Sequence, residues 1–152
     1  MRILRDAVPG TTFDCGVIPI ALEDQEERIR RGFVCEKLPL YSGPARWGPP
    51  VAAPSTGFGV LLYKKPTEAL SEVVQNGGVG LFGAIEYRTI NGPILLDRAY
   101  QVSAEIIAVG QSPRTEYVWL DTTATDDDGR VVATVRLQIR FMKETSPLYQ
   151  KD

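Results

Sequence analysis

The stretch that decides the fold is ATVRLQIRF, residues 133–141, near the end of a chain of 152 residues. Apolar side chains occupy every second position, and threonine, arginine and glutamine stand between them. Successive side chains of a β-strand point to opposite faces, so strict alternation predicts a strand with one face on the core and one in water. The expected inner face consists of Ala133, Val135, Leu137, Ile139 and Phe141.

Upstream segments predict further antiparallel strands. Residues 114–123 are rich in aromatic and β-branched side chains, residues 100–108 place apolar side chains at alternate positions, and residues 80–89 form another strand-like run. Between the last two strands, residues 126–129 (DDDG) have the composition of a hairpin turn.

The first half of the chain has a different character. Residues 11–20 predict a first strand, and residues 23–31 (EDQEERIRR) predict a short exposed helix. Five prolines predict irregular backbone over residues 32–55, because proline fixes φ and donates no N–H. Residues 56–65 are apolar enough for a buried helix, and Pro66 is expected to kink it or restart it. The order of elements is that of an α+β protein.

Two glycines, Gly57 and Gly59, weaken the predicted buried helix by about 1 kcal/mol each relative to alanine. Close packing of the helix against the sheet would explain why glycine stands at both positions. We therefore expect these residues to face the sheet.

Charge and hydropathy limit the possible partners. The chain has 17 basic and 19 acidic residues, a net charge of -2, so we expect no binding to nucleic acid or to an anionic membrane. No stretch approaches the roughly 18 consecutive apolar residues of a membrane span, and charged residues rather than a secretory apolar segment follow Met1. We expect a cytoplasmic protein with a single domain over residues 1–152.

The sequence contains no histidine, which removes the usual general base near neutral pH and the commonest metal ligand. The two cysteines do not form a CxxC pair, and the DDDG turn lacks the spacing of a calcium loop. We therefore expect neither a metal nor a cofactor. Acid–base chemistry would rely on Asp, Glu, Tyr, Cys or Lys.

Taken together, the order of elements and the proline-rich loop resemble the hotdog fold of MaoC-like, R-specific enoyl-CoA hydratases. The family motif reads roughly GDxNPLH, followed by a glycine and an APP-like element that leads into a central helix. Pro39 and Leu40 match this motif directly. The corresponding segments here are EKLPLY (36–41), RWG (46–48) and VAAPS (51–55), and DGRVVAT (128–134) resembles the family's hairpin. The resemblance covers nearly the whole chain and implies a curved antiparallel sheet wrapped around one central helix.

The resemblance also implies an active site, in which the family's Asp and His exchange protons with an acyl thioester. In this chain those positions are Glu36 and Tyr41. Glu36 would serve as base if burial raised its pKa from about 4.3, and Tyr41, with an ordinary pKa of about 10, would serve as acid or oxyanion donor. The implied function is that of a hydratase or dehydratase, a lyase that acts on an acyl-CoA-like or similarly apolar substrate through a non-standard site.

Several other residues are candidates for substrate binding. The resemblance points to Trp47, Pro54 and Ser55. The fork of the Arg114 guanidinium fits a phosphate or carboxylate, although a solvent-facing position is the simpler interpretation. Tyr117 and Trp119 share a strand face, where they would line a tunnel or a subunit interface or pack in the core.

Two alternatives stay open. Noncatalytic hotdog subunits often carry tyrosine at the histidine position, so this chain could bind substrate for a histidine-bearing partner. A hotdog thioesterase would instead use Glu68 or Glu72, four residues apart on the predicted helix. Because hotdog proteins usually pair through their sheets, we expect a homodimer or a hetero-oligomer with another hotdog subunit.

Overall fold

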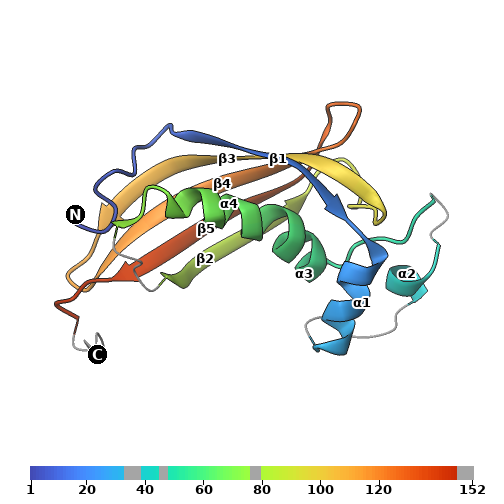
Figure 1. Cartoon of the computed structure of the whole chain (residues 1–152), viewed down its shortest axis with the longest axis horizontal. Coiled ribbons are helices and arrows are strands. Elements are labelled where there is room, and N and C mark those ends of the chain that lie inside the picture. The colour runs from blue at the N-terminus through green and yellow to red at the C-terminus, as the bar shows by residue number, and fades with distance from the viewer. Residues whose placement is uncertain (33–38, 45–47, 76–79, 147–152) are drawn as a thin grey trace.

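In the computed structural model of the chain, the structure describes residues 1–32, 39–44, 48–75 and 80–146. A single antiparallel sheet of five strands arches over one long helix (Figure 1). The order across the sheet is β1-β3-β4-β5-β2. The strands are β1 (Thr12–Ile20), β2 (Gly80–Thr89), β3 (Arg98–Gln111), β4 (Thr115–Thr125) and β5 (Val131–Met142). The predicted α+β hotdog fold is therefore confirmed.

The core lies between the concave face of the sheet and the helix. All five predicted inner-face residues of β5 are buried, which confirms the alternation seen in the sequence. Val118 and Leu120 of β4 lie beside them and belong to the same hydrophobic cluster as Leu61 and Leu62 of the helix. Each fully buried aliphatic side chain of this kind contributes roughly 1.5–3 kcal/mol to folding.

The central helix runs without interruption through three segments, so the predicted restart at Pro66 is wrong, and the predicted kink stays a prediction. Pro66 is the third residue of the last segment. Directly before that segment the helix is π-helical, with backbone hydrogen bonds between residues five apart. The segments are α3 (Pro54–Gly57), η1 (Phe58–Tyr63, the π-helical part) and α4 (Lys64–Ser71).

Strand β3 departs from its predicted pattern at a bulge. The pairing of β3 with β4 shifts register between Ile106 and Ala108, so Ile107 is an extra residue in the strand. A bulge of this kind turns the following side chains out of phase. Ala108, predicted to share the buried face with Ile106, is therefore only partly buried.

Helix α1 (Leu22–Arg30) follows β1 and confirms the short helix predicted there, and helix α2 (Pro39–Ser42) is a single turn beside it. Both lie at the end of the molecule where α3 begins (Figure 1). Among the described helices, none combines the length and the apolar character needed to cross a lipid bilayer.

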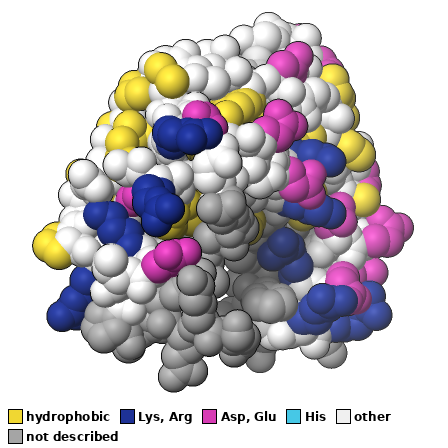
Figure 2. Space-filling model, turned by 60° about the vertical axis from the view of Figure 1, so that its left-hand side comes forward, with side chains coloured by type: hydrophobic (Ala, Val, Ile, Leu, Met, Phe, Trp, Pro, Cys, Tyr) yellow, Lys and Arg dark blue, Asp and Glu magenta, His cyan; other side chains and the backbone are white. Residues whose placement is uncertain are grey.

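The opposite end of the molecule carries the N-terminus. There the buried carboxylate of Glu116 accepts hydrogen bonds from the backbone N–H groups of Arg2, Ile3 and Leu4, at 2.7, 3.0 and 2.9 Å. A cavity of about 270 Å³ opens beside Glu116, between the N-terminal residues and the end of β5. Figure 2 turns this end forward and shows basic and acidic side chains interspersed over the surface.

Candidate functional site

Gln25 connects three segments at the start of the central helix. Its side chain is completely buried, although it belongs to the highly charged helix α1. The Nε2 group donates hydrogen bonds to the carbonyl oxygens of Tyr41, at 2.5 Å, and Val51, at 3.1 Å. The Oε1 atom accepts a hydrogen bond from the backbone N–H of Ala53 at 2.6 Å. A side-chain amide can donate and accept at once, so one residue ties α1, α2 and the start of α3 together.

This connection brings three of the predicted site residues to one place. The backbone of Tyr41 is held through Gln25 to Ala53, which directly precedes Pro54 and Ser55. The side chains of Tyr41 and Ser55 are partly buried, and Pro54 is exposed. Tyr41, Pro54 and Ser55 therefore gather at the N-terminal end of the central helix.

Two further predicted residues, Glu36 and Trp47, lie outside the described residues. The pairing of Glu36 with Tyr41 and the contribution of Trp47 to substrate binding stay predictions.

Tyr87 of β2 is a candidate that the sequence alone did not reveal. A β-carbon on Gly57 would lie 3.1 Å from the Tyr87 hydroxyl and 2.8 Å from Ile94 Cδ1, so this phenol lies against the first turn of the central helix. Burial raises the pKa of Tyr87 to about 12. The phenol thus stays protonated at physiological pH and can donate a hydrogen bond. The glycine at position 57 was the available signal, because it predicted close packing of the helix against the sheet.

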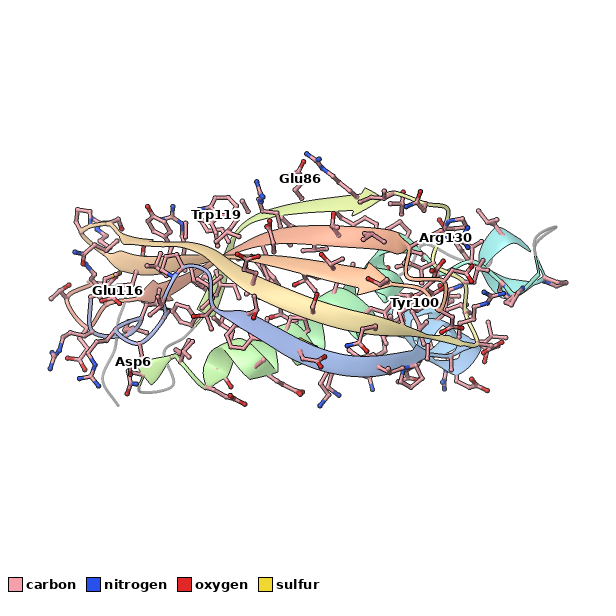
Figure 3. The ribbon with its side chains drawn as sticks, turned by 90° about the horizontal axis from the view of Figure 1, so that it is seen from above. Asp6, Glu86, Tyr100, Glu116, Trp119 and Arg130 are labelled. Atoms are coloured by element: carbon pink, nitrogen blue, oxygen red, sulfur yellow. The ribbon has the colours of Figure 1, made fainter. Side chains whose placement is uncertain are left out.

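Tyr117 and Trp119 lie on the other face of the sheet. Along β4 the buried positions alternate with partly exposed ones, and both aromatic residues belong to the partly exposed set. Figure 3 shows Trp119 on the side of the sheet turned away from the central helix. The Tyr117 ring lies under the guanidinium of Arg140, with 5.2 Å between Cζ and the ring centroid. These side chains are therefore not brought together with Tyr41.

Arg114 is likewise distant from the start of the central helix. It is exposed in the turn between β3 and β4, and its carbonyl accepts a hydrogen bond from the N–H of Lys143, which lines the cavity at the opposite end of the molecule. The structure does not unite Arg114 with Tyr41 and Ser55.

The acids considered for thioester hydrolysis lie near the C-terminal end of the central helix. Glu68 forms an ion pair with Lys65 at 2.8 Å on the surface, and the hydrogen bond from Lys65 lowers the pKa of Glu68. Glu72 is exposed directly after the end of α4. Neither carboxylate lies at the end of the helix that holds Tyr41.

Comparison with known proteins gives a likeness of structure only. No model of a protein family matches the sequence, and no curated protein matches it. Among solved structures, the (3R)-hydroxyacyl-ACP dehydratase complex HadBC of Mycobacterium tuberculosis superposes with a TM-score of 0.74 at 17% identity, covering 90% of this chain and 99% of the other. A monoamine oxidase regulatory protein from Archaeoglobus superposes with a TM-score of 0.73 at 15% identity, covering 93% of this chain and 94% of the other. The R-hydratase PhaJ1 of Pseudomonas aeruginosa superposes with a TM-score of 0.65 at 14% identity, covering 99% of this chain and 96% of the other. These superpositions establish the fold. Because the identities are low, the chemistry has to be argued from the residues of the site.

Proposed function

Since the chain has the hotdog fold of the MaoC-like dehydratases, we propose that it hydrates or dehydrates an acyl thioester, or a similarly apolar substrate, at the N-terminal end of its central helix. The observation that supports this most directly is the Gln25 side chain, which fixes Tyr41 to the residue preceding that helix. If the loop that carries Tyr41 were held elsewhere, Tyr41 would not lie near Pro54 and Ser55.

The proposed chemistry uses a carboxylate and phenols in place of histidine. In hydration, Glu36 takes a proton from water as the water oxygen bonds to the β-carbon and the electrons of the C=C bond move toward the thioester carbonyl. The protonated Glu36 then delivers this proton to the α-carbon, which completes the addition and restores the carboxylate. The Tyr41 hydroxyl donates a hydrogen bond to the thioester oxygen on which negative charge develops. Tyr87, whose pKa burial raises to about 12, is a second donor at the same end of the helix.

The test is an assay of the purified chain with crotonyl-CoA, following loss of the enoyl thioester. We expect Glu36→Gln to lower kcat/KM by about thirtyfold or more, which corresponds to about 2 kcal/mol of transition-state stabilisation. Tyr41→Phe should lower kcat with less effect on KM. Glu26→Gln, an exposed change on α1, is the matched control and should leave both constants unchanged. Full activity of Glu36→Gln would remove Glu36 from the mechanism.

A second candidate function is that of a subunit that binds substrate for a catalytic hotdog partner. The observation in its favour is the edge strand β2. Its apolar side chains Leu81, Phe82 and Ile85 have exposed fractions of 46%, 57% and 48%. Edge strands with apolar side chains and unpaired backbone groups readily join a strand of another chain. An isolated chain that is inert, and that gains hydratase activity when mixed with a histidine-bearing hotdog protein, would favour this alternative.

A further inference from the structure

Arg28 lies directly against the central helix at the candidate site. It stands three residues after Gln25 on α1, so both side chains project from the same face of that helix. A β-carbon on Gly59 would overlap the guanidinium of Arg28, which therefore fills the space that a side chain at position 59 would need. Gly59 was expected to face the sheet. The space beside its α-carbon is instead filled by the Arg28 side chain of α1.

The guanidinium of Arg28 has no partner among the described residues. Three basic side chains in the described part of the chain are partly buried, namely Arg28, Arg140 and Lys143. Arg140 donates to Gln138 at 2.8 Å, and Lys143 donates to Gln111 at 2.8 Å. Arg28 makes no hydrogen bond or ion pair with any described residue, whereas its neighbour Glu27 pairs with Arg30 and Arg31 on the surface.

Among the described residues, none compensates for the partial burial of this guanidinium. A guanidinium carries five N–H donors, so partial burial without an acceptor loses hydration that no described residue replaces. Gly59 also lowers the stability of the helix, since glycine within a helix is about 1 kcal/mol less favourable than alanine. A ligand that supplied acceptor oxygens to Arg28 would offset the lost hydration and this lower helix stability.

We propose that Arg28 binds an anionic oxygen group of the ligand, a phosphate or a carboxylate, against the Gly59 face of the central helix. The inference rests on the proposed function, because Arg28 and Tyr41 are both adjacent to Gln25 and lie at the same end of that helix. The planar guanidinium fork matches the oxygens of either group. Ser55, one turn before Gly59, lies on the same face of the helix.

Two thioesters with the same acyl group distinguish this role from a purely structural one. Crotonyl-CoA carries phosphates, and crotonyl-pantetheine carries none. We expect Arg28→Gln to raise KM for crotonyl-CoA roughly tenfold or more, with kcat nearly unchanged, and to leave KM for crotonyl-pantetheine unaltered. Arg30→Gln, on the same helix but exposed and paired with Glu27, is the matched control and should behave as wild type.

The second source of the anion is the acyl group. If Arg28 binds an acyl carboxylate, wild type should prefer a dicarboxylic acyl-pantetheine to crotonyl-pantetheine, and Arg28→Gln should remove that preference. Equal behaviour of Arg28→Gln and wild type with all three thioesters would overturn the proposal while leaving the proposed function intact.

Gly59→Ala tests the same site without altering any charge. The new methyl group would displace the guanidinium, so we expect the same rise in KM as in Arg28→Gln. The free energy of unfolding should stay equal or increase, since alanine favours the helix. Wild-type KM in Gly59→Ala would contradict the placement of the anion against this face.

A binding measurement covers the case in which no acyl thioester is turned over. Titration of the ¹⁵N-labelled protein with adenosine 3′,5′-bisphosphate should shift the Nε–H resonance that is missing in Arg28→Gln, and the shift should saturate. A saturating shift without turnover would retain the anion site and reject the proposed function. No shift with this bisphosphate or with glutarate as a carboxylate probe, together with no turnover, would reject both.

Discussion

The backbone N–H of Ala53 donates a hydrogen bond to the side-chain oxygen of Gln25 at 2.6 Å. We expect Gln25→Leu to lower the free energy of unfolding by about 2–4 kcal/mol, because the buried N–H of Ala53 and the carbonyl of Val51 would lose their partner. Urea denaturation measures the change. Gln101→Leu, which removes an exposed glutamine bonded to Asp14, should cost less than about 1 kcal/mol. Equal losses in the two variants would contradict the role assigned to Gln25.

Glu116 makes the stability of the chain depend on pH in the acid range. Burial opposes its ionisation, but the backbone N–H groups of Leu4, Arg2 and Ile3 outweigh this effect and lower the pKa of Glu116 below its ordinary value. A carboxyl whose pKa is lower in the folded state contributes stability that is present above its unfolded pKa of about 4.3 and is lost as pH falls through the folded pKa.

We therefore expect Glu116→Gln to destabilise the protein by about 1–3 kcal/mol at pH 7 and by much less near pH 3. Chemical denaturation of both proteins over this range gives the comparison. A difference between wild type and variant that stayed constant with pH would show that the ionised carboxylate is not the stabilising species.

Tyr87 should titrate separately from an ordinary phenol. Burial raises its pKa to about 12. Because the folded pKa lies above the unfolded value of about 10, the associated stability is fully present below pH 10 and is lost as pH rises toward 12. Ultraviolet titration of the folded protein should show a phenol ionising near pH 12 that is missing in Tyr87→Phe. An unchanged titration curve in the variant would assign the late ionisation to another tyrosine.

The edge of β2 should govern association. Its exposed side chain Ile85 is an apolar residue on a strand with a free edge, and lysine at such positions opposes strand pairing. We expect Ile85→Lys to shift the oligomer toward the monomer in sedimentation velocity. Val17→Lys, at an exposed apolar position on the opposite edge strand β1, serves as control. A monomeric wild type would reject association through β2.

Local alternation made most of the sheet predictable. β2 spans residues 80–89 as expected, and the alternating face of β5 is buried as its sequence indicates. The bulge after Ile106 was not predictable, because the inserted Ile107 is as apolar as its neighbours and disturbs the pattern only through pairing with β4. The π-helical stretch before Pro66 was not predicted from the sequence either.

The candidate site was predictable only in part. The loop motif pointed to Tyr41, Pro54 and Ser55, and the structure brings these to the start of the central helix. Gln25 and Arg28 could not be found in this way, since they belong to a segment in which almost every residue is polar. Leu22 and Ile29, three residues before and four after Gln25, mark this face only weakly, and which polar residues face inward depends on how α1 docks.

The order of the strands across the sheet also has a consequence for the time course of folding. β3, β4 and β5 pair with their neighbours in sequence through short turns, whereas β1 pairs with β3 and β2 with β5 across long intervening segments. Closing long loops is slow relative to forming local hairpins. We expect amide protons of the β3–β4–β5 meander to be protected first in pulsed hydrogen exchange, with both edge strands joining later. The strand offered to a partner chain would then be among the last parts of the monomer to form.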